Sequence, residues 1–326
     1  MNIVIKLPNN TRDRILTFPF LHSLHKYFAK KIEENEEEEE EVLNFHLISL
    51  KADIDILNLL PFHAYYHELD DTDVKNVFSA HRACVTFKID RPDIYISTTE
   101  SFVDASLGKQ LGIKTKVGFE IGKNKWLFNK RIDFLEGQHQ SVQYFNLLRA
   151  FTDELPTIPN ATSRKLDPVY KDWSEKPYTV INLDLIDGKV NSEWIEFFDL
   201  FENKTFVLLC KELPLVEQNV FLQDYVNKLP TKNSYKIFIY NSNIDFGKLI
   251  SYAVTLVTHE SYIMHLSAYI GAYVFYLNKV ENLKLTGAEY FAGNVRDFSV
   301  KGNAYAQAFD DIYAYIEEKT KQTEEN

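Results

Sequence analysis

The sequence predicts an α/β protein built from two doubly wound domains. In both halves of the 326-residue chain, short apolar runs rich in β-branched residues alternate with amphipathic stretches of helical spacing. Such alternation is typical of right-handed βαβ units and a parallel sheet. A segment that holds four of the ten prolines and lacks apolar periodicity separates the halves. We therefore expect a domain at 1–153, a linker at 154–177 and a second domain at 178–326.

The first half contains four clear strand patterns. They lie at 2–7, 45–50, 93–98 and 115–119. Apolar residues recur at helical spacing over 15–32 and 139–152. Pro19 falls early in the first of these helices, so that helix must either start late or bend there.

The second half repeats the alternation more regularly. Strands are expected at 178–183, 205–210, 236–240, 254–258 and 273–277. Helices are expected at 191–202, 214–228, 245–251 and 261–269. In folds of this class, ligands bind at the carboxyl ends of the strands. We expect a ligand site there, in a cleft between the two domains.

Composition and charge exclude several classes of function. The chain carries 36 Lys and Arg against 47 Asp and Glu, a net charge of −11, which disfavours a nucleic-acid partner. No apolar run approaches the roughly 20 residues of a membrane helix, and no signal peptide is evident, so a cytoplasmic location is expected. The two cysteines, Cys84 and Cys210, are far apart. Without a cluster of metal-binding residues, we expect no metal and no cofactor.

Asp13 is the first candidate for a functional side chain. It stands after the first strand, where the first helix is expected to begin. One interpretation is a helix N-cap, for which Asp is a preferred residue. The other is a general base, because a carboxylate at the carboxyl end of a strand can accept a proton from an attacking hydroxyl. The residues alone leave both interpretations open.

The segment 254–277 carries the strongest local pattern. It reads as strand, polar turn, helix, glycine and strand, with Glu260 and Ser261 at the helix start. Free amides at such a helix start favour phosphate binding. His265 lies four residues after Ser261, on about the same helix face. A lone histidine is more often a satisfied, partly buried residue, but here it coincides with the turn and with the break at Gly271.

Taken together, the motifs resemble the ADP-heptose lipopolysaccharide heptosyltransferases of glycosyltransferase family nine. In that family a strand leads into Asp-(Ser/Thr)-Gly-x-x-His-Leu-x-(Ala/Thr)-Ala, and this chain has ESYIMHLSA at 260–268. The family's N-terminal Gly-Asp followed by Thr-x-Pro is similar to 12–19. Further similar stretches lie at 93–101, 111–119 and 139–148. The order of these motifs across nearly the whole chain carries the resemblance.

The resemblance implies a GT-B fold and an inverting, metal-independent transfer of a sugar from a nucleotide-diphosphate donor. By this resemblance Asp13 is the catalytic base, and the donor site is formed by the following residues: for the diphosphate, Arg12, Lys189, Glu260, Ser261, Tyr262 and His265; for the nucleoside, Glu217 and Asn241. The implied partners are ADP-heptose and a lipid-linked or other glycan acceptor such as the lipopolysaccharide core. A peripheral contact with the inner membrane is part of the same expectation.

The chain also departs from the family pattern. Arg12 and Tyr262 stand where the family has glycines, and Glu260 stands where it has Asp. Glycines there would let the backbone approach a ligand closely. The hydroxyl residues expected before Lys189 are replaced by Asp184 and Leu185. Three hypotheses follow: an active glycosyltransferase, a relative that binds a sugar nucleotide or partner without transfer, and an unrelated doubly wound protein.

Overall fold

The computed structural model forms two compact units. It describes residues 1–34, 42–52, 54–158, 166, 177–183, 185–186, 189–190, 192–211, 225–278, 283–288, 293–299 and 306–324. Unit 1 comprises Met1–Ala161 and Leu283–Tyr290, and unit 2 comprises Thr162–Asn282 and Phe291–Asn326. Sequence analysis placed 283–290 in the second domain, whereas this segment belongs to unit 1. Most of the expected linker lies outside the described residues.

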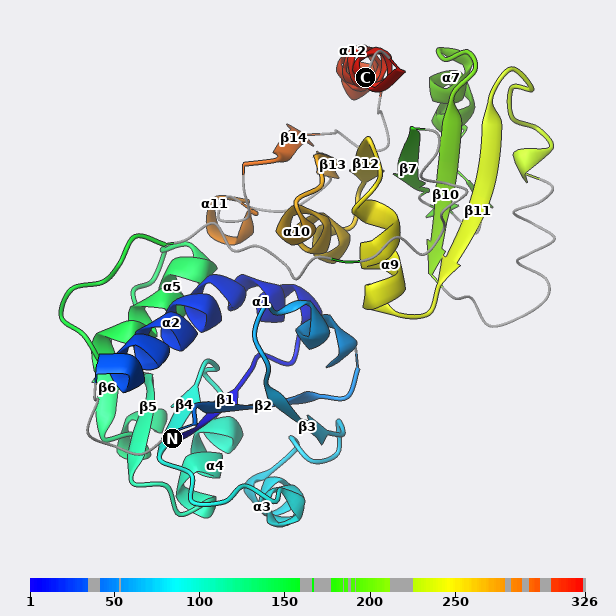
Figure 1. Ribbon diagram of the computed structural model, residues 1–326. Coiled ribbons are helices and arrows are strands. Elements are labelled where there is room, and N and C mark those ends of the chain that lie inside the picture. Colours follow the sequence, from blue (N-terminus) through cyan, green and yellow to red (C-terminus); the bar gives the residue numbers. More distant parts are fainter. Residues whose placement is uncertain are drawn as a thin grey trace. The chain divides into compact units, whose positions relative to one another are not determined.

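Unit 1 is built on a six-stranded sheet in which every neighbouring pair is parallel. The order is β3-β2-β1-β4-β5-β6, which can be followed in Figure 1. Its strands are β1 (Asn2–Lys6), β2 (Asn44–Leu50), β3 (Tyr65–Leu69), β4 (Ile94–Ser97), β5 (Thr115–Phe119) and β6 (Lys130–Ile132). The central strands are mostly apolar and buried, as expected for a parallel sheet covered on both faces.

Helices cover both faces of this sheet. They are α1 (Thr11–Leu16), α2 (Phe18–Glu34), α3 (Val77–Thr86), α4 (Phe102–Gln110), α5 (Gln140–Asn146) and α11 (Leu283–Thr286), with the short 3-10 helices η1 (Ile54–Leu59), η2 (Asn124–Trp126) and η3 (Leu147–Ala150). Helices α3 and α4 pack together on one face, while α2 and α5 lie side by side on the other. Apolar side chains from the strands and from α3 and α4 form one continuous core.

The single helix expected at 15–32 is in fact two helices. The first begins earlier, at Thr11, and ends at Leu16. The hydroxyl of Thr17 donates to the carbonyl of Arg14 at 2.6 Å, and α2 restarts at Phe18. Pro19 therefore falls in the first turn of α2, where the missing N–H is tolerated. The break that Pro19 required from sequence is confirmed.

Unit 2 repeats the strand order of unit 1. Its six-stranded parallel sheet runs β11-β10-β7-β12-β13-β14, and an antiparallel hairpin of two short strands follows β7. The strands are β7 (Tyr178–Asn182), β8 (Leu185–Ile186), β9 (Lys189–Val190), β10 (Thr205–Lys211), β11 (Ser234–Tyr240), β12 (Thr255–Thr258), β13 (Val274–Asn278) and β14 (Val295–Ser299).

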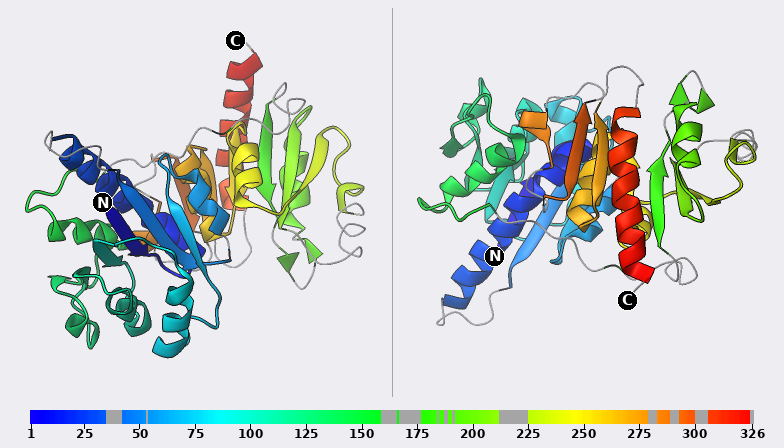
Figure 2. Two further views of the ribbon diagram at one scale, coloured as in Figure 1. Left: turned by 60° about the horizontal axis from the view of Figure 1, so that its bottom comes forward. Right: turned by 90° about the horizontal axis from the view of Figure 1, so that it is seen from above.

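Two layers of helices enclose the second sheet. They are α7 (Glu193–Asp199), α9 (Asn243–Ile250), α10 (Ser261–Ile270) and α12 (Ala306–Glu324). Helices α7 and α12 pack together, and their aromatic and aliphatic side chains meet those of the strands in one core around Trp194. Figure 2 shows α12 running beside the strands of this sheet. Helices α9 and α10 pack against each other on the opposite face.

The strands that sequence analysis missed lie at or next to the sheet edges. Strand β3 reads YYHEL and β6 reads KRI, so neither presents an apolar run. Strand β14, VRDFS, is similarly mixed. Edge strands are partly exposed and need fewer apolar residues, which removes the pattern used to find them. Among the described residues, no helix is long and apolar enough to cross a bilayer.

Candidate active site

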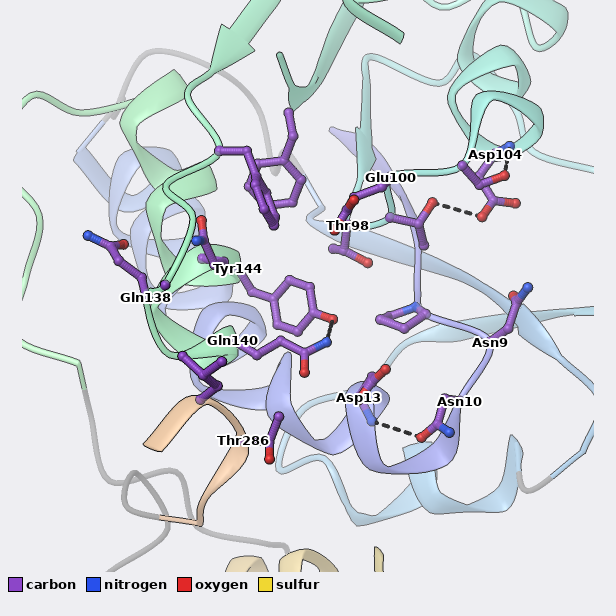
Figure 3. A pocket seen from close by; sticks show the side chains of 18 residues that line it. Asn9, Asn10, Asp13, Thr98, Glu100, Asp104, Gln138, Gln140, Tyr144 and Thr286 are labelled. Carbon is purple, nitrogen blue, oxygen red and sulfur yellow. Dashed lines mark hydrogen bonds between the residues drawn. The ribbon is translucent and has the colours of Figure 1, made fainter. Parts of the chain in front are cut away.

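Unit 1 holds a cavity of about 550 Å³ at the carboxyl edge of its sheet. The loops after β1 and β4 form two of its walls. The strand order reverses between these two strands, so their loops diverge and leave a crevice. Helix α5 and residues 285–286 of α11 form the third wall, as Figure 3 shows. A cavity within unit 1 therefore lies at the carboxyl ends of the strands, where folds of this class bind ligands.

Asp13 lies in this cavity and does not cap a helix. The N-cap of α1 is Asn10, whose side-chain oxygen accepts a hydrogen bond from the amide of Asp13 at 3.4 Å. The N-cap interpretation of Asp13 is therefore wrong, because the chain supplies another cap three residues earlier. The Asp13 carboxylate is 20% exposed and accepts a bond from Nε of Arg12 at 2.9 Å. This leaves a positioned carboxylate at the cavity wall (Figure 3).

Two buried cations hold the β1–α1 loop in place. Lys6 is fully buried and donates to the carbonyl of Leu7 at 2.6 Å and to Oδ1 of Asn9 at 2.8 Å. Arg14, also fully buried, donates to the carbonyls of Pro8 at 3.1 Å and Asn9 at 2.8 Å. Burial lowers the pKa of Lys6. With its carbonyls engaged in this way, the loop that precedes Asp13 has little freedom to move.

Tyr144 of α5 faces Asp13 across the cavity. The Tyr144 hydroxyl is buried and accepts a hydrogen bond from Nε2 of Gln140 at 2.6 Å. Burial raises the pKa of Tyr144, and the negative charges of Asp13 and Glu100 raise it further. The hydroxyl therefore stays protonated at neutral pH and is able to donate to a bound ligand. Figure 3 shows Tyr144 and Asp13 bordering the same space.

The remaining lining resembles a surface for hydroxyl-rich ligands. Amide side chains come from both the β1–α1 loop and α5, among them Asn9 and Gln140. Phe119 and Phe134 line one wall and pack edge to face, with ring centroids 5.5 Å apart. Aromatic rings offer an apolar face, while amides supply donors and acceptors together. Such a lining suits a sugar, which presents hydroxyls on its rim and C–H groups on its faces.

Unit 2 places its own candidate residues at the equivalent point of its sheet. The order reverses between β7 and β12, and the ends of these strands are joined by a bond from Asn182 to the Thr258 hydroxyl at 3.0 Å. Lys189 lies in β9, in the hairpin that follows β7; its side chain is outside the described part of the chain. Glu260 follows β12. The backbone therefore brings the segments of Lys189 and Glu260 to the same sheet edge.

The turn before α10 differs from the helix starts that border the unit 1 cavity. Glu260 is the N-cap residue, but its side chain makes no capping bond, unlike Asn10 of α1 and Ser101 of α4. The Ser261 hydroxyl oxygen is buried and bonds to none of the described residues. An uncapped helix start leaves backbone donors for an anionic ligand.

Tyr262 adopts ordinary helical geometry in the second position of α10. A residue of that conformation needs no positive φ, so the missing glycine causes no backbone strain at this point. Its hydroxyl is hydrogen-bonded to that of Tyr240, at the end of β11. His265 is fully buried, so its ring is not exposed at the helix start. Asn241 is exposed next to Tyr240, and Glu217 lies outside the described residues.

Sequence reasoning missed several residues that line the cavity. Glu100 directly precedes the N-cap of α4, Asp104 lies in the first turn of that helix, and Tyr144 lies in α5. Glu100 and Tyr144 fall within the similar stretches 93–101 and 139–148, whereas Asp104 lies in none of them. No charge or spacing marked these side chains as neighbours of Asp13. The ring of His139 adds an unforeseen contact to the carbonyl of Gly287 at 3.0 Å. That contact ties the segment around α11 to α5 of unit 1.

Comparison with known proteins places the fold. No family model and no curated protein matches the chain in sequence. Among solved structures, E. coli heptosyltransferase WaaC with ADP is similar at a TM-score of 0.74 and 13% identity, covering 98% of this chain and 100% of that chain. A glycosyl transferase family 9 protein from Veillonella parvula gives 0.71 and 14%, covering 99% and 96%. A putative UDP-N-acetylglucosamine 2-epimerase from Listeria monocytogenes gives 0.54 and 12%, covering 98% and 90%.

These neighbours agree with the two sheets described above. At such low identity the likeness establishes the fold, and it extends over almost the full length of each neighbour. Each unit has a six-stranded parallel sheet, and in both sheets the strand order is 3-2-1-4-5-6 when strands are numbered along each unit. The chain thus has an α/β fold of the GT-B type, with the structural likeness to heptosyltransferases that its motifs predicted.

Proposed function

We propose that the protein is an inverting, metal-independent glycosyltransferase that moves a sugar from a nucleoside-diphosphate donor to a glycan acceptor. The observation that carries this proposal is the position of Asp13. Its carboxylate does not cap a helix and lies at the wall of a sugar-sized cavity. The similarity to a heptosyltransferase solved with ADP supports a nucleotide sugar as donor. Heptose is the sugar that the resemblance favours.

The proposed reaction is a single displacement. An acceptor hydroxyl in the unit 1 cavity gives its proton to the Asp13 carboxylate while its oxygen attacks the anomeric carbon of the donor. The bond from that carbon to the diphosphate oxygen breaks, and the nucleoside diphosphate leaves with the electron pair. Attack opposite the leaving group inverts the anomeric centre. Tyr144, protonated and close to Asp13, is suited to orient the acceptor by hydrogen bonding.

In this proposal, charge on the leaving diphosphate is balanced within unit 2. Lys189 supplies a cation, and the uncapped start of α10 supplies backbone amides and the positive end of the helix dipole. Interactions that strengthen as charge develops on the leaving group lower the barrier of the transfer step. Arg12 pairs with Asp13, and in this proposal it contributes on the side of the base.

A second candidate function is binding of a sugar nucleotide without transfer. The observation that favours it is the hydrogen bond between Tyr262 and Tyr240, which puts two aromatic side chains at the sheet edge where a donor would bind. In that case the pair narrows the donor site. Turnover separates the two candidates, because both include donor binding.

A panel of sugar nucleotides tests the proposal. Thermal shift identifies the donor, because a ligand that binds only the folded protein raises its melting temperature. The best donor is then incubated with glycan acceptors in excess chelator, and the anomeric configuration of the product is read by NMR. Transfer with inversion is expected. Retention of configuration, or activity that returns only with added Mg²⁺ or Mn²⁺, would contradict the mechanism, and donor binding without any product would favour the second candidate.

A further inference from the structure

The charge of the unit 1 cavity has a consequence for the acceptor, if the cavity binds the acceptor as proposed above. Its lining includes three carboxylates, those of Asp13, Glu100 and Asp104. None of the lining residues that the structure describes is Lys, Arg or His. A sugar that carries a carboxylate or a phosphate would find no cation there to pair with.

Two of the three carboxylates are already engaged. Asp13 accepts from Arg12 at 2.9 Å. Asp104 accepts from the Thr99 hydroxyl at 2.8 Å and lies 3.7 Å from Nζ of the buried Lys6. Arg12 and Lys6 therefore already bind groups of the chain itself and are not free to pair with a ligand.

The third carboxylate, Glu100, is exposed and forms no ion pair with any described residue. The backbone of Glu100 is held at the cavity, because its carbonyl accepts a hydrogen bond from the buried Asn124 side chain. Its charge is felt across the cavity, since it contributes to the raised pKa of Tyr144. An unpaired, positioned negative charge disfavours a like-charged ligand.

The helix starts that border the cavity do not offer an alternative anion site. Helix α1 holds Asp13 in its first turn, and Asn10 occupies its cap. Helix α4 holds Asp104 in its first turn, and Ser101 accepts the amide of Asp104 at 3.3 Å. Each positive helix end is thus already matched by a carboxylate of the chain itself.

We infer that the cavity selects an acceptor whose bound sugar unit carries no negative charge, and that Glu100 sets this preference. The amides and the phenylalanine pair bind hydroxyls and ring faces, and Glu100 rejects sugars with acidic substituents. Neutral hexoses and amino sugars both satisfy this chemistry. The inference narrows the acceptor class and leaves the donor open.

Matched methyl glycosides test the inference. The acceptors are a hexose, its 2-amino-2-deoxy analogue and its uronic acid, each assayed for kcat/KM with the donor found by thermal shift. Saturation-transfer NMR measures binding of the same three compounds without donor. In the native protein we expect the uronic acid to be at least tenfold poorer than the better of the other two. The gap should narrow at high salt, because salt screens exposed charges.

Glu100→Gln should lower the ratio of kcat/KM for the hexose to kcat/KM for the uronic acid by about fivefold. Glu100→Lys should lower this ratio further. Glu68→Gln, which removes an exposed glutamate on β3 away from the cavity, should leave the ratio as it is. The inference is overturned if the uronic acid binds or reacts as well as the hexose, or if Glu100→Gln leaves the ratio unchanged. Either result leaves the proposed function intact. Neutral or amino glycosides that bind but never receive a sugar refute the function and uphold the inference.

Discussion

The two units present the same sheet edge in two different ways. In unit 1, the loops after β1 and β4 stay apart and border a cavity with Asp13 on its wall. In both units the ends of the two strands are joined by a hydrogen bond, from the Thr98 hydroxyl to the carbonyl of Lys6 in unit 1 and from Asn182 to Thr258 in unit 2. Unit 2 adds a hydrogen bond between Tyr262 and Tyr240 at this edge. One strand order, 3-2-1-4-5-6, therefore supports an acidic cavity in one unit and an edge with a pair of hydrogen-bonded tyrosines in the other.

Helix capping explains much of this difference. In unit 1, Asn10 and Ser101 cap the helix starts at the cavity, so the carboxylates of Asp13 and Asp104 are not used as caps. In unit 2, α10 begins without a side-chain cap. A capped start with an added carboxylate suits proton acceptance, whereas an uncapped start suits an anion. The two edges thus suit the two roles of the proposed mechanism, the base in unit 1 and the diphosphate site in unit 2.

Replacement of Asp13 by Asn is expected to have the largest effect. The variant keeps the size of the side chain but loses the ability to accept a proton. Transfer should fall by about 10²–10⁴-fold, the usual cost of removing a general base, while the Kd of the donor stays the same. Steady-state kinetics and calorimetric titration measure the two quantities.

Asp245→Asn is the matched control in unit 2. Asp245 also follows a cap residue by three positions, and its amide donates to Ser242 at 3.1 Å. Both substitutions remove a carboxylate from the first turn of a helix, so both should cost about 0.3–1 kcal/mol of stability. Only the change at Asp13 should abolish transfer. Equal rates in the two variants would leave Asp13 as a helix-start charge without a catalytic role.

Lys189→Ala should have the next largest effect. If this lysine meets the donor diphosphate, its loss removes a charge-assisted interaction of about 1.5–3 kcal/mol, which corresponds to roughly ten- to hundredfold in affinity. The donor Kd and the transfer rate should worsen together. Lys228→Ala, which removes an exposed lysine of unit 2, serves as control. A donor Kd that is unaltered in the Lys189 variant would remove this residue from the site.

Tyr262→Ala should change the donor Kd by about tenfold, roughly 1.4 kcal/mol. An active enzyme uses the ring as part of an adapted donor site, so weaker binding is expected. Tyr262→Phe separates the ring from the hydroxyl that bonds to Tyr240. Tighter binding by the Ala variant would mean that the ring obstructs the site and would favour the non-catalytic candidate. An unchanged Kd would show that this turn does not touch the donor.

Asn10→Ala should have the smallest effect and should act on stability. It removes the cap of α1, a loss of about 1 kcal/mol that urea unfolding would detect. Transfer should decline only modestly, because Lys6 and Arg14 still hold the preceding loop. A collapse of transfer without a loss of stability would instead place Asn10 in contact with substrate.

The sequence was sufficient for the central strands but not for the cavity. Strands such as β1 and β12 are buried on both faces, and strands buried in this way have runs of apolar residues that can be recognised in the sequence. Edge strands such as β3 carry no such run. The position of Asp13 at a strand end was predictable from topology. That Asp13 does not cap the helix was not predictable, because Asn and Asp are both preferred N-cap residues and only the three-dimensional structure decides between Asn10 and Asp13.

Long-range contacts escaped prediction for a related reason. Glu100 and Tyr144 approach Asp13 through folding of distant segments, and no local pattern encodes that proximity. The same is true of the bond from His139 to Gly287, which draws α11 into unit 1. Tyr262 stands where the resembled family has a glycine. The helix nevertheless begins at Ser261, as expected, and the tyrosine takes a normal helical conformation.

The most direct test of the central claim is the position of an acceptor relative to residue 13. A crystal structure of the Asp13→Asn variant with a nucleoside diphosphate and a neutral glycan acceptor would provide it. The account predicts that an acceptor hydroxyl lies in the unit 1 cavity, about 2.6–3.2 Å from the side chain of residue 13. An acceptor bound elsewhere, with no hydroxyl within reach of that side chain, would contradict the assignment of Asp13 as the base.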